Sequence, residues 1–264
     1  MQDLSITLIQ AELQWEDAEA NLRQFDDIIA STDPSTDLIL LPEMFNTGFS
    51  MNVDKCSESP EGMTIKWLRE KAASKNCVVA GSVLTREGPA FFNRFVWMCP
   101  DGTYAHYDKR HLFSMAGEDK IMSAGGSRTI VGLKDWNINL QVCYDLRFPV
   151  WSRNSYRDGR HEYDVLVYIA NWPEVRKEAY QRLLPARAIE NQSYAVWVNR
   201  VGKDGRDIYH SGDSGVYDPM GNALAMAKAG SGEVLHVTLS ADLLLQQRSK
   251  FRIGPDWDPF NIDR

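Results

Sequence analysis

The segment LQVCYDLRFP, residues Leu140–Pro149, joins two kinds of sequence. An apolar run ends at Cys143, and a charged and aromatic segment follows at once. This pattern predicts a buried strand that stops at the cysteine and gives way to a polar turn. We therefore expect Cys143 to stand at the end of a strand, at a sharp turn into the segment that follows.

Two other polar residues stand in the same position relative to an apolar strand. Glu43 follows a short buried strand in LILLPEMF, and Lys109 closes another strand in YAHYDKRHLF. Taken singly, a glutamate after proline and a lysine after aspartate are usually surface residues. The carboxyl ends of strands are, however, where catalytic groups gather in open α/β sheets. Their shared placement with Cys143 predicts a common site.

The chemistry of these three residue types explains why they would meet. A free thiol is mostly protonated at neutral pH, with a pKa of about 8.5. A nearby ammonium lowers that pKa, and a carboxylate can accept the proton. When the thiolate attacks a carbonyl or nitrile carbon, an ammonium and a backbone N–H can stabilise the charge that develops. Cysteine, glutamate and lysine thus form a nucleophilic set that needs no histidine.

The remainder of the chain alternates strands and helices. Helices are expected at residues 17–31, 61–75, 147–158, 174–192 and 240–249. Strands are expected at 4–10, 37–42, 77–84, 164–172, 193–201 and 232–239, with strand pairs over 91–109, 127–145 and 214–227. Several antiparallel pairs among alternating helices predict an α/β fold, a mixed-sheet sandwich flanked by helices.

Composition limits the partners that we expect. The 264 residues are 44% apolar and 25% charged, and the formal net charge is −7. No basic block stands out, so neither nucleic acid nor an anionic membrane is an expected partner. The start, MQDLSITLIQAELQW, has no cationic segment followed by a long apolar core, so we expect neither a signal peptide nor a transmembrane span.

The four cysteines do not form a recognisable metal or disulfide pattern. None belongs to a CxxC pair, and no histidine pair has zinc spacing. We expect reduced thiols in a cytoplasmic protein. Cys77 and Cys99 are interpreted as small buried apolar residues, and Cys56 lies in a polar segment that predicts no role.

The motifs together resemble those of the nitrilase, or carbon–nitrogen hydrolase, superfamily. LPEMF, YDKRHLF and CYDLRFP carry the resemblance, with support from PDGTYAHYDKRHLF, ARAIENQSYAVWVNRVG and SGVYDPMGNAL. The similarity extends from about residue 4 to about residue 240. It implies a four-layer αββα sandwich, a single domain over residues 1–264 and a homodimer. The thioester route that it implies needs no metal or organic cofactor.

Within that superfamily the chain looks most similar to the Nit-type omega-amidases. That branch hydrolyses the terminal amide of 2-oxoglutaramate and 2-oxosuccinamate, so the expected partner is a small amide substrate. The resemblance implies that Cys143 is the nucleophile, Glu43 the base and Lys109 the oxyanion stabiliser. It also assigns the N–H of Tyr144 as a second oxyanion donor. Glu118, in SMAGEDKIMSAG, matches a second glutamate that orients the amide and the lysine.

One residue departs from the family pattern. Many relatives have a glutamate after the proline of the cysteine motif, and here Val150 follows Pro149. We expect this change to leave the three catalytic positions intact and to alter local helix packing.

Five further residues near the catalytic positions are candidates for the turn or the pocket wall. Asp145 and Arg147 are expected to brace the turn through a local charge pair, or Arg147 meets a substrate carboxylate instead. Trp172 follows a strand end in ANWPEVR and either lines the site or packs in the core. Phe45 and Phe49 flank Glu43 and are candidates for the pocket wall.

Three alternatives remain open from sequence. The same fold serves nitrilases, N-carbamoyl-amino-acid hydrolases and general aliphatic amidases, and a non-catalytic interaction module is a further possibility. A histidine-assisted cysteine hydrolase would need a histidine beside Cys143. His111 is the closest candidate because strand alternation points it to the side of Lys109; the others are His106, His161, His210 and His236.

Overall fold

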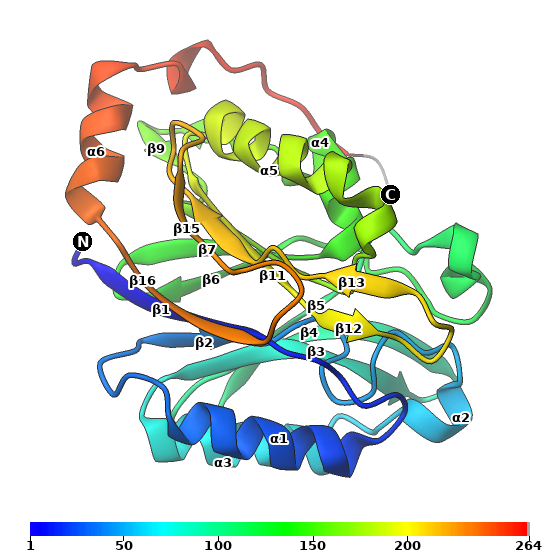
Figure 1. Ribbon diagram of the computed structural model, residues 1–264. Coiled ribbons are helices and arrows are strands. Elements are labelled where there is room, and N and C mark those ends of the chain that lie inside the picture. The colour runs from blue at the N-terminus through cyan, green and yellow to red at the C-terminus, as the bar shows by residue number, and fades with distance from the viewer. Residues whose placement is uncertain (263–264) are drawn as a thin grey trace.

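Two six-stranded sheets packed face to face form the centre of the computed structural model, which describes residues 1–262 (Figure 1). In spatial order, the first sheet consists of β16 (Glu233–Leu239), β1 (Leu4–Gln10), β2 (Leu38–Leu40), β3 (Val78–Glu87), β4 (Ala90–Met98) and β5 (Tyr104–Asp108). The second consists of β15 (Ala223–Met226), β14 (Gly215–Tyr217), β11 (Tyr194–Asn199), β10 (Val165–Ala170), β7 (Trp136–Val142) and β6 (Thr129–Leu133).

Both sheets are mixed. In the first, β1, β2 and β3 run parallel, while β16, β4 and β5 pair antiparallel with their neighbours. In the second, β7, β10 and β11 run parallel, and hairpins close both edges. Parallel strands bring their carboxyl ends to the same edge of each sheet, which is where the sequence predicts the site.

Helices cover the two outer faces, so the layers follow the order α, β, β, α (Figure 1). The first sheet is covered by α1 (Ala18–Ala30) and α3 (Met63–Lys75), and the second by α5 (Lys177–Asn191) and the short α4 (Pro149–Ser152). Helix α6 (Ala241–Lys250) follows the edge strand β16. The predicted αββα sandwich is confirmed.

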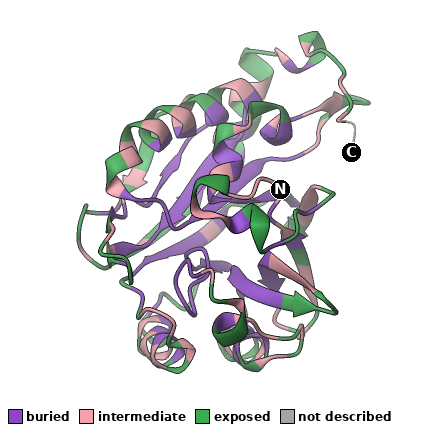
Figure 2. Ribbon diagram, turned by 90° about the vertical axis from the view of Figure 1, so that its right-hand side faces the viewer, coloured by how far each residue is buried: buried purple, intermediate pink, exposed green. Residues whose placement is uncertain are grey.

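Burial explains why the central strands are apolar on both faces. In β2 and just after it, Leu38 and Leu40 belong to the core between the sheets, while Ile39 and Leu41 pack with residues of α1 and α3. Strands covered on both faces show nearly continuous apolar runs rather than alternation. Figure 2 shows the buried residues concentrated in the sheets and exposed residues on the outer helices.

The expected helix over 147–158 is wrong. The segment instead contains a 3-10 helix, η3 (Cys143–Arg147), then α4, and then a small hairpin of β8 (Tyr156–Arg157) and β9 (Arg160–His161). Proline disfavours helical geometry in the residue before it, and Phe148 is outside the helical region, with φ −113° and ψ 88°. Asp158 and Gly159 both have positive φ and form the tight turn of the hairpin.

Some smaller elements were not predicted from sequence. They are α2 (Val53–Cys56), the hairpin of β12 (Val201–Lys203) and β13 (Tyr209–Ser211), and the 3-10 turns η1 (Ser114–Ala116), η2 (Glu118–Lys120), η4 (Glu174–Arg176) and η5 (Gly254–Asp256). Across residues 1–262, no helix combines the length and the apolar character needed to cross a bilayer.

Candidate active site

The structure brings Glu43, Lys109 and Cys143 together at the edge where the two sheets face each other. Glu43 lies just beyond β2 and Lys109 directly after β5, both in the first sheet, whereas Cys143 follows β7 in the second. Glu43 and Lys109 are fully buried, and the thiol of Cys143 lines a cavity with Lys109. The rule that placed polar residues at strand ends therefore locates one cluster built from both sheets.

Cys143 has an unusual backbone conformation. Its φ is +47°, in the left-handed region that a residue with a side chain rarely adopts. Such strain persists only where the surrounding structure holds it, and it is common at functional sites. The chain turns here from β7 into η3, which is the expected sharp turn. Tyr144 stands at the start of η3, where N–H groups have no intrahelical acceptor.

Asp145 holds this turn, but not in the way expected. Its Oδ2 accepts hydrogen bonds from the Val142 N–H at 3.0 Å and the Tyr107 hydroxyl at 2.8 Å. Its Oδ1 lies 3.0 Å from the His111 backbone nitrogen and 2.8 Å from His111 Nδ1. Both oxygens of the Asp145 carboxylate are therefore occupied by other donors, and the Arg147 guanidinium lies over the Trp172 ring instead. The predicted Asp145–Arg147 pair is therefore wrong.

The buried carboxylates and the lysine form one hydrogen-bonded network. Lys109 Nζ lies 2.9 Å from Glu43 Oε1 and 2.9 Å from Glu118 Oε2. Glu118 also accepts the N–H of Phe113 at 2.6 Å. Glu118 is fully buried and does not line the cavity, so its contacts fix the lysine rather than reach into the open space.

Two asparagines complete the network, and sequence reasoning missed both. Asn93, on β4, donates from Nδ2 to Glu43 at 2.8 Å and to Glu118 at 3.2 Å. Asn171 donates its backbone N–H to Glu43 Oε2 at 2.8 Å and its side-chain amide to the Glu43 carbonyl at 3.0 Å. Asn171 directly follows β10, so the strand-end rule would have found it. Asn93 lies within the antiparallel strand β4. The one feature of the sequence that could have pointed to it is its polar side chain among apolar residues.

The electrostatics favour a protonated thiol at rest. Burial and the Glu43 carboxylate raise the pKa of the Cys143 thiol well above its ordinary value, and Lys109 offsets only part of this. Burial opposes the charge on Lys109, but Glu118 and Glu43 outweigh it and raise the pKa of that ammonium. Burial also raises the pKa of Glu118 despite the adjacent lysine. Lys109 does lower the pKa of the thiol, as expected from the sequence. The combined effect of all groups is nevertheless to raise that pKa.

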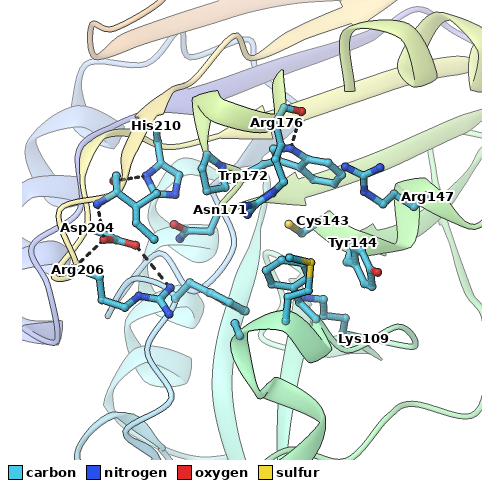
Figure 3. A pocket seen from close by; sticks show the side chains of 16 residues that line it. Lys109, Cys143, Tyr144, Arg147, Asn171, Trp172, Arg176, Asp204, Arg206 and His210 are labelled. Atoms are coloured by element: carbon cyan, nitrogen blue, oxygen red, sulfur yellow. Dashed lines mark hydrogen bonds and ion pairs between the residues drawn. The ribbon is translucent and has the colours of Figure 1, made fainter. Parts of the chain in front are cut away.

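A cavity of about 170 Å³ opens above the thiol (Figure 3). It is small beside the roughly 300–1,000 Å³ of sites for drug-sized ligands, so it suits a short substrate. Three expected residues, Tyr144, Arg147 and Trp172, line it. Phe49 also lines it, 5.0 Å from Lys109 Nζ to the ring centroid. Phe45 does not, because its ring packs in the core under the first sheet; its expected place in the pocket wall is wrong.

Trp172 serves both of the roles considered for it. Its ring packs edge-on against Tyr180 and Trp197 in the core and also faces the cavity. Its indole N–H donates to the Arg176 carbonyl at 3.1 Å. The Arg147 guanidinium lies 4.8 Å from the centroid of the Trp172 ring. Trp172 therefore positions two arginines at the cavity.

Two histidines lie near the cysteine turn or at the cavity, and both contact partners other than the thiol. His111 contacts Asp145 and stacks on Phe148 at 3.7 Å, and it does not line the cavity. His210 does line the cavity, but its Nδ1 lies 3.0 Å from the Ile208 carbonyl. The other three, His106, His161 and His236, are absent from the cavity lining. This arrangement does not favour the histidine-assisted alternative.

Comparison with known proteins agrees with this geometry. The sequence model of the family described as carbon-nitrogen hydrolase matches residues 5–249. The chain belongs to the carbon–nitrogen hydrolase family. The resemblance drawn from the motifs is thereby confirmed.

Individual carbon–nitrogen hydrolases match over nearly the whole chain. Omega-amidase YafV of Yersinia enterocolitica is 44% identical over 260 residues, which are 98% of this chain and 99% of that protein. The 2-oxoglutaramate amidase of Bacillus subtilis is 29% identical over 251 residues, 94% of this chain and 93% of that one. A crystal structure of a CN-hydrolase superfamily protein from Xanthomonas campestris, with an arsenic adduct in its active site, is 40% identical, with a TM-score of 0.97 and full coverage of both chains.

Proposed function

We propose that this protein is an omega-amidase, which hydrolyses the terminal amide of 2-oxoglutaramate or 2-oxosuccinamate to the 2-oxo dicarboxylate and ammonia. The observation that carries the proposal is the buried Glu43–Lys109 contact close to Cys143, whose thiol lines a small cavity. The chain also matches an omega-amidase over 98% of its length. The prediction of an amidase of this type, made from the motifs, is confirmed by the comparisons.

In the proposed mechanism, Glu43 takes the thiol proton as Cys143 Sγ attacks the amide carbon. The protonated resting thiol and the neighbouring carboxylate support this order, because the thiolate then forms only as the bond to carbon forms. Negative charge develops on the amide oxygen. Lys109 and the N–H of Tyr144 are proposed to stabilise it, as an oxyanion hole does.

The tetrahedral intermediate then collapses. The carbon–nitrogen bond breaks, the proton on Glu43 goes to the leaving nitrogen, and ammonia departs from a thioester on Cys143. Glu43 next takes a proton from water, which attacks the thioester carbon. Collapse of this second intermediate releases the carboxylic acid, and Glu43 returns its proton to sulfur, so the residue acts as base, acid, base and acid in turn. Glu118 is proposed to hold Lys109 in place throughout.

The alternatives on the same fold differ in substrate. A nitrilase, an N-carbamoyl-amino-acid hydrolase and a general aliphatic amidase would share the cysteine chemistry. The test is to compare kcat/KM for 2-oxoglutaramate, glutamine, butyramide, an aliphatic nitrile and an N-carbamoyl amino acid. We expect a strong preference for 2-oxoglutaramate. Equal rates on butyramide would indicate a general amidase, and no thiol-dependent turnover of any substrate would indicate a non-catalytic module.

We further propose that residues 1–264 act as a single hydrolase domain in a cytoplasmic homodimer. The resemblance to the superfamily supports these proposals. Light scattering tests the assembly: a homodimer has twice the 30.0 kDa mass of the chain. A mass of one chain across the working concentration range would contradict it.

A further inference from the structure

The cavity above Cys143 is cationic in a protein that is acidic as a whole. Three arginines line it, Arg147, Arg176 and Arg206, together with Lys109 at its floor. Asp204 is the one acidic residue among the described residues of the lining. The formal net charge of the chain is −7, so this local excess of positive charge is not a reflection of composition.

The three arginines differ in whether their charge is balanced. Arg206 Nη2 lies 3.6 Å from Asp204 Oδ2. Within residues 1–262, neither Arg147 nor Arg176 forms an ion pair; each faces an aromatic ring instead. Arg176 lies 5.0 Å from the centroid of Phe113, and Arg147 4.8 Å from that of Trp172. Two guanidinium groups at the cavity therefore lack a counter-ion within the described chain.

Arg176 is the one directed into the cavity. Figure 3 shows its side chain reaching from η4 toward Cys143, whereas the Arg147 guanidinium lies beside the Trp172 ring. Arg176 is half-buried and Arg147 is exposed. The bond from the Trp172 indole to the Arg176 carbonyl fixes the start of that side chain. Burial lowers the pKa of Arg176; Cys143 opposes this shift, and the like charges of Arg147 and Arg206 add to it.

Resting on the omega-amidase function proposed above, we propose that Arg176 binds the carboxylate at the far end of the substrate, and that Arg147 adds a second positive charge beside it. A guanidinium presents paired N–H donors that match a carboxylate in a bidentate contact. The carboxylate would supply the missing counter-ion, and the amide at its other end would reach Cys143.

This subsite also predicts a preference for a 2-oxo acid over an amino acid. Glutamine carries an ammonium next to its carboxylate, and that ammonium would be brought close to Arg147 and Arg176. Like charges in a partly desolvated site repel, and Asp204, the acid in the lining, already pairs with Arg206. A 2-oxo group is uncharged and avoids this cost. A neutral amide such as butyramide would leave both guanidinium groups without a partner.

The experiment compares Arg176→Gln with the unaltered enzyme on two substrates. We expect kcat/KM for 2-oxoglutaramate to fall by about 10²-fold, since a charge-assisted contact is lost, while the value for butyramide changes little. Arg176→Lys should retain part of the rate because the charge stays. Arg182→Gln is the matched control: Arg182 lies on the exposed face of α5, paired with Glu178, and both substrates should keep their rates.

A second readout does not depend on turnover. The product 2-oxoglutarate should occupy the same subsite and protect Cys143 from iodoacetamide, and Arg176→Gln should abolish that protection. Equal losses on both substrates, or full protection in the variant, would overturn the assignment. If the unaltered enzyme prefers 2-oxoglutaramate and Arg176→Gln keeps that preference, the subsite fails and the omega-amidase function stands. If the unaltered enzyme shows no preference, the proposed function fails first.

Discussion

Lys109 Nζ and Glu43 Oε1 lie 2.9 Å apart, and both side chains are fully buried. Removing two charges from water is costly, and their attraction compensates only when further hydrogen bonds satisfy both groups. Here Asn93, Asn171 and Glu118 supply those bonds. The network carries two carboxylates for one ammonium, so it opposes a further negative charge on the nearby thiol. The cluster is thus arranged to accept a proton from Cys143 rather than to hold a thiolate permanently.

The Cys143 thiol pKa should respond in opposite directions to two substitutions. Glu43 raises that pKa and Lys109 lowers it. Glu43→Gln should therefore lower the thiol pKa although turnover falls by about 10²–10⁴ through loss of the base. Lys109→Met should raise it, while turnover falls by about 10²–10³. The measurement is a pH titration of the thiolate ultraviolet absorbance.

A Cys143→Ser variant supplies the background from the other three cysteines in that titration. Shifts in the same direction for both variants would contradict the electrostatic account. An unshifted thiol and unchanged turnover in Lys109→Met would remove the lysine from the site.

Asp145 connects the cysteine turn to the lysine segment, so its loss should affect both. Its carboxylate accepts from Val142 beside the cysteine and from Tyr107 and His111 on either side of Lys109. Asp145→Asn turns one acceptor oxygen into a donor and leaves a buried N–H or hydroxyl unsatisfied. We expect a loss of about 1–3 kcal/mol in the free energy of unfolding. Turnover should fall by at least about tenfold, because small displacements of reacting groups are costly.

Urea unfolding and steady-state rates check this expectation, with the exposed Asp207→Asn as the control. His111→Ala separates the structural role from a catalytic histidine, since it removes the ring and keeps the backbone N–H that bonds Asp145. Turnover near the original value in His111→Ala is expected. A loss of turnover in His111→Ala with an unchanged free energy of unfolding would instead support the histidine-assisted mechanism.

His210 should make the folded state sensitive to mild acid. Burial, with the neighbouring Arg200, lowers the pKa of His210 to about 4, compared with about 6.5 in an unfolded chain. The unfolded state therefore binds the proton more readily, so this stability is present above pH 6.5 and is lost as the pH falls toward 4. We expect His210 to account for a decrease of about 2 kcal/mol in the free energy of unfolding between pH 7 and pH 5.

Comparing the unaltered protein with His210→Gln at both pH values isolates this contribution, because the carboxylates titrate alike in the two proteins. The variant should lose less stability on acidification. Identical pH dependence in both proteins would show that His210 is not buried as a neutral imidazole.

Site residues that follow a strand could be predicted from the sequence. Residues whose role depends on contacts between distant segments could not. Glu43, Lys109 and Cys143 were found because each follows a predicted strand. Asn93 was missed because its role depends on contacts with Glu43 and Glu118, which come from other segments of the chain and are not encoded in any local pattern. The Asp145–Arg147 pair was inferred from adjacency in sequence, yet Asp145 is surrounded by donors from β5 and the segment that follows it.

The same limit applies to the fold. The long strands and helices were predicted because their periodicity is strong. The helix expected over 147–158 failed because Pro149 and the Asp158–Gly159 turn outweigh its apolar residues. Arg176 was not predicted as a site residue. Only the structure shows that it lines the same cavity as Cys143 and that, within the described chain, its guanidinium has no carboxylate partner.

The nucleophilic role of Cys143 is tested by measuring turnover of 2-oxoglutaramate in Cys143→Ser. The two side chains are similar in size, so circular dichroism should show an unchanged fold, and we expect kcat to fall by roughly 10⁴-fold or more. Cys56→Ser, a change in a buried cysteine outside the cavity, should keep the original rate. A folded Cys143→Ser variant that hydrolyses 2-oxoglutaramate at the original rate would contradict the mechanism.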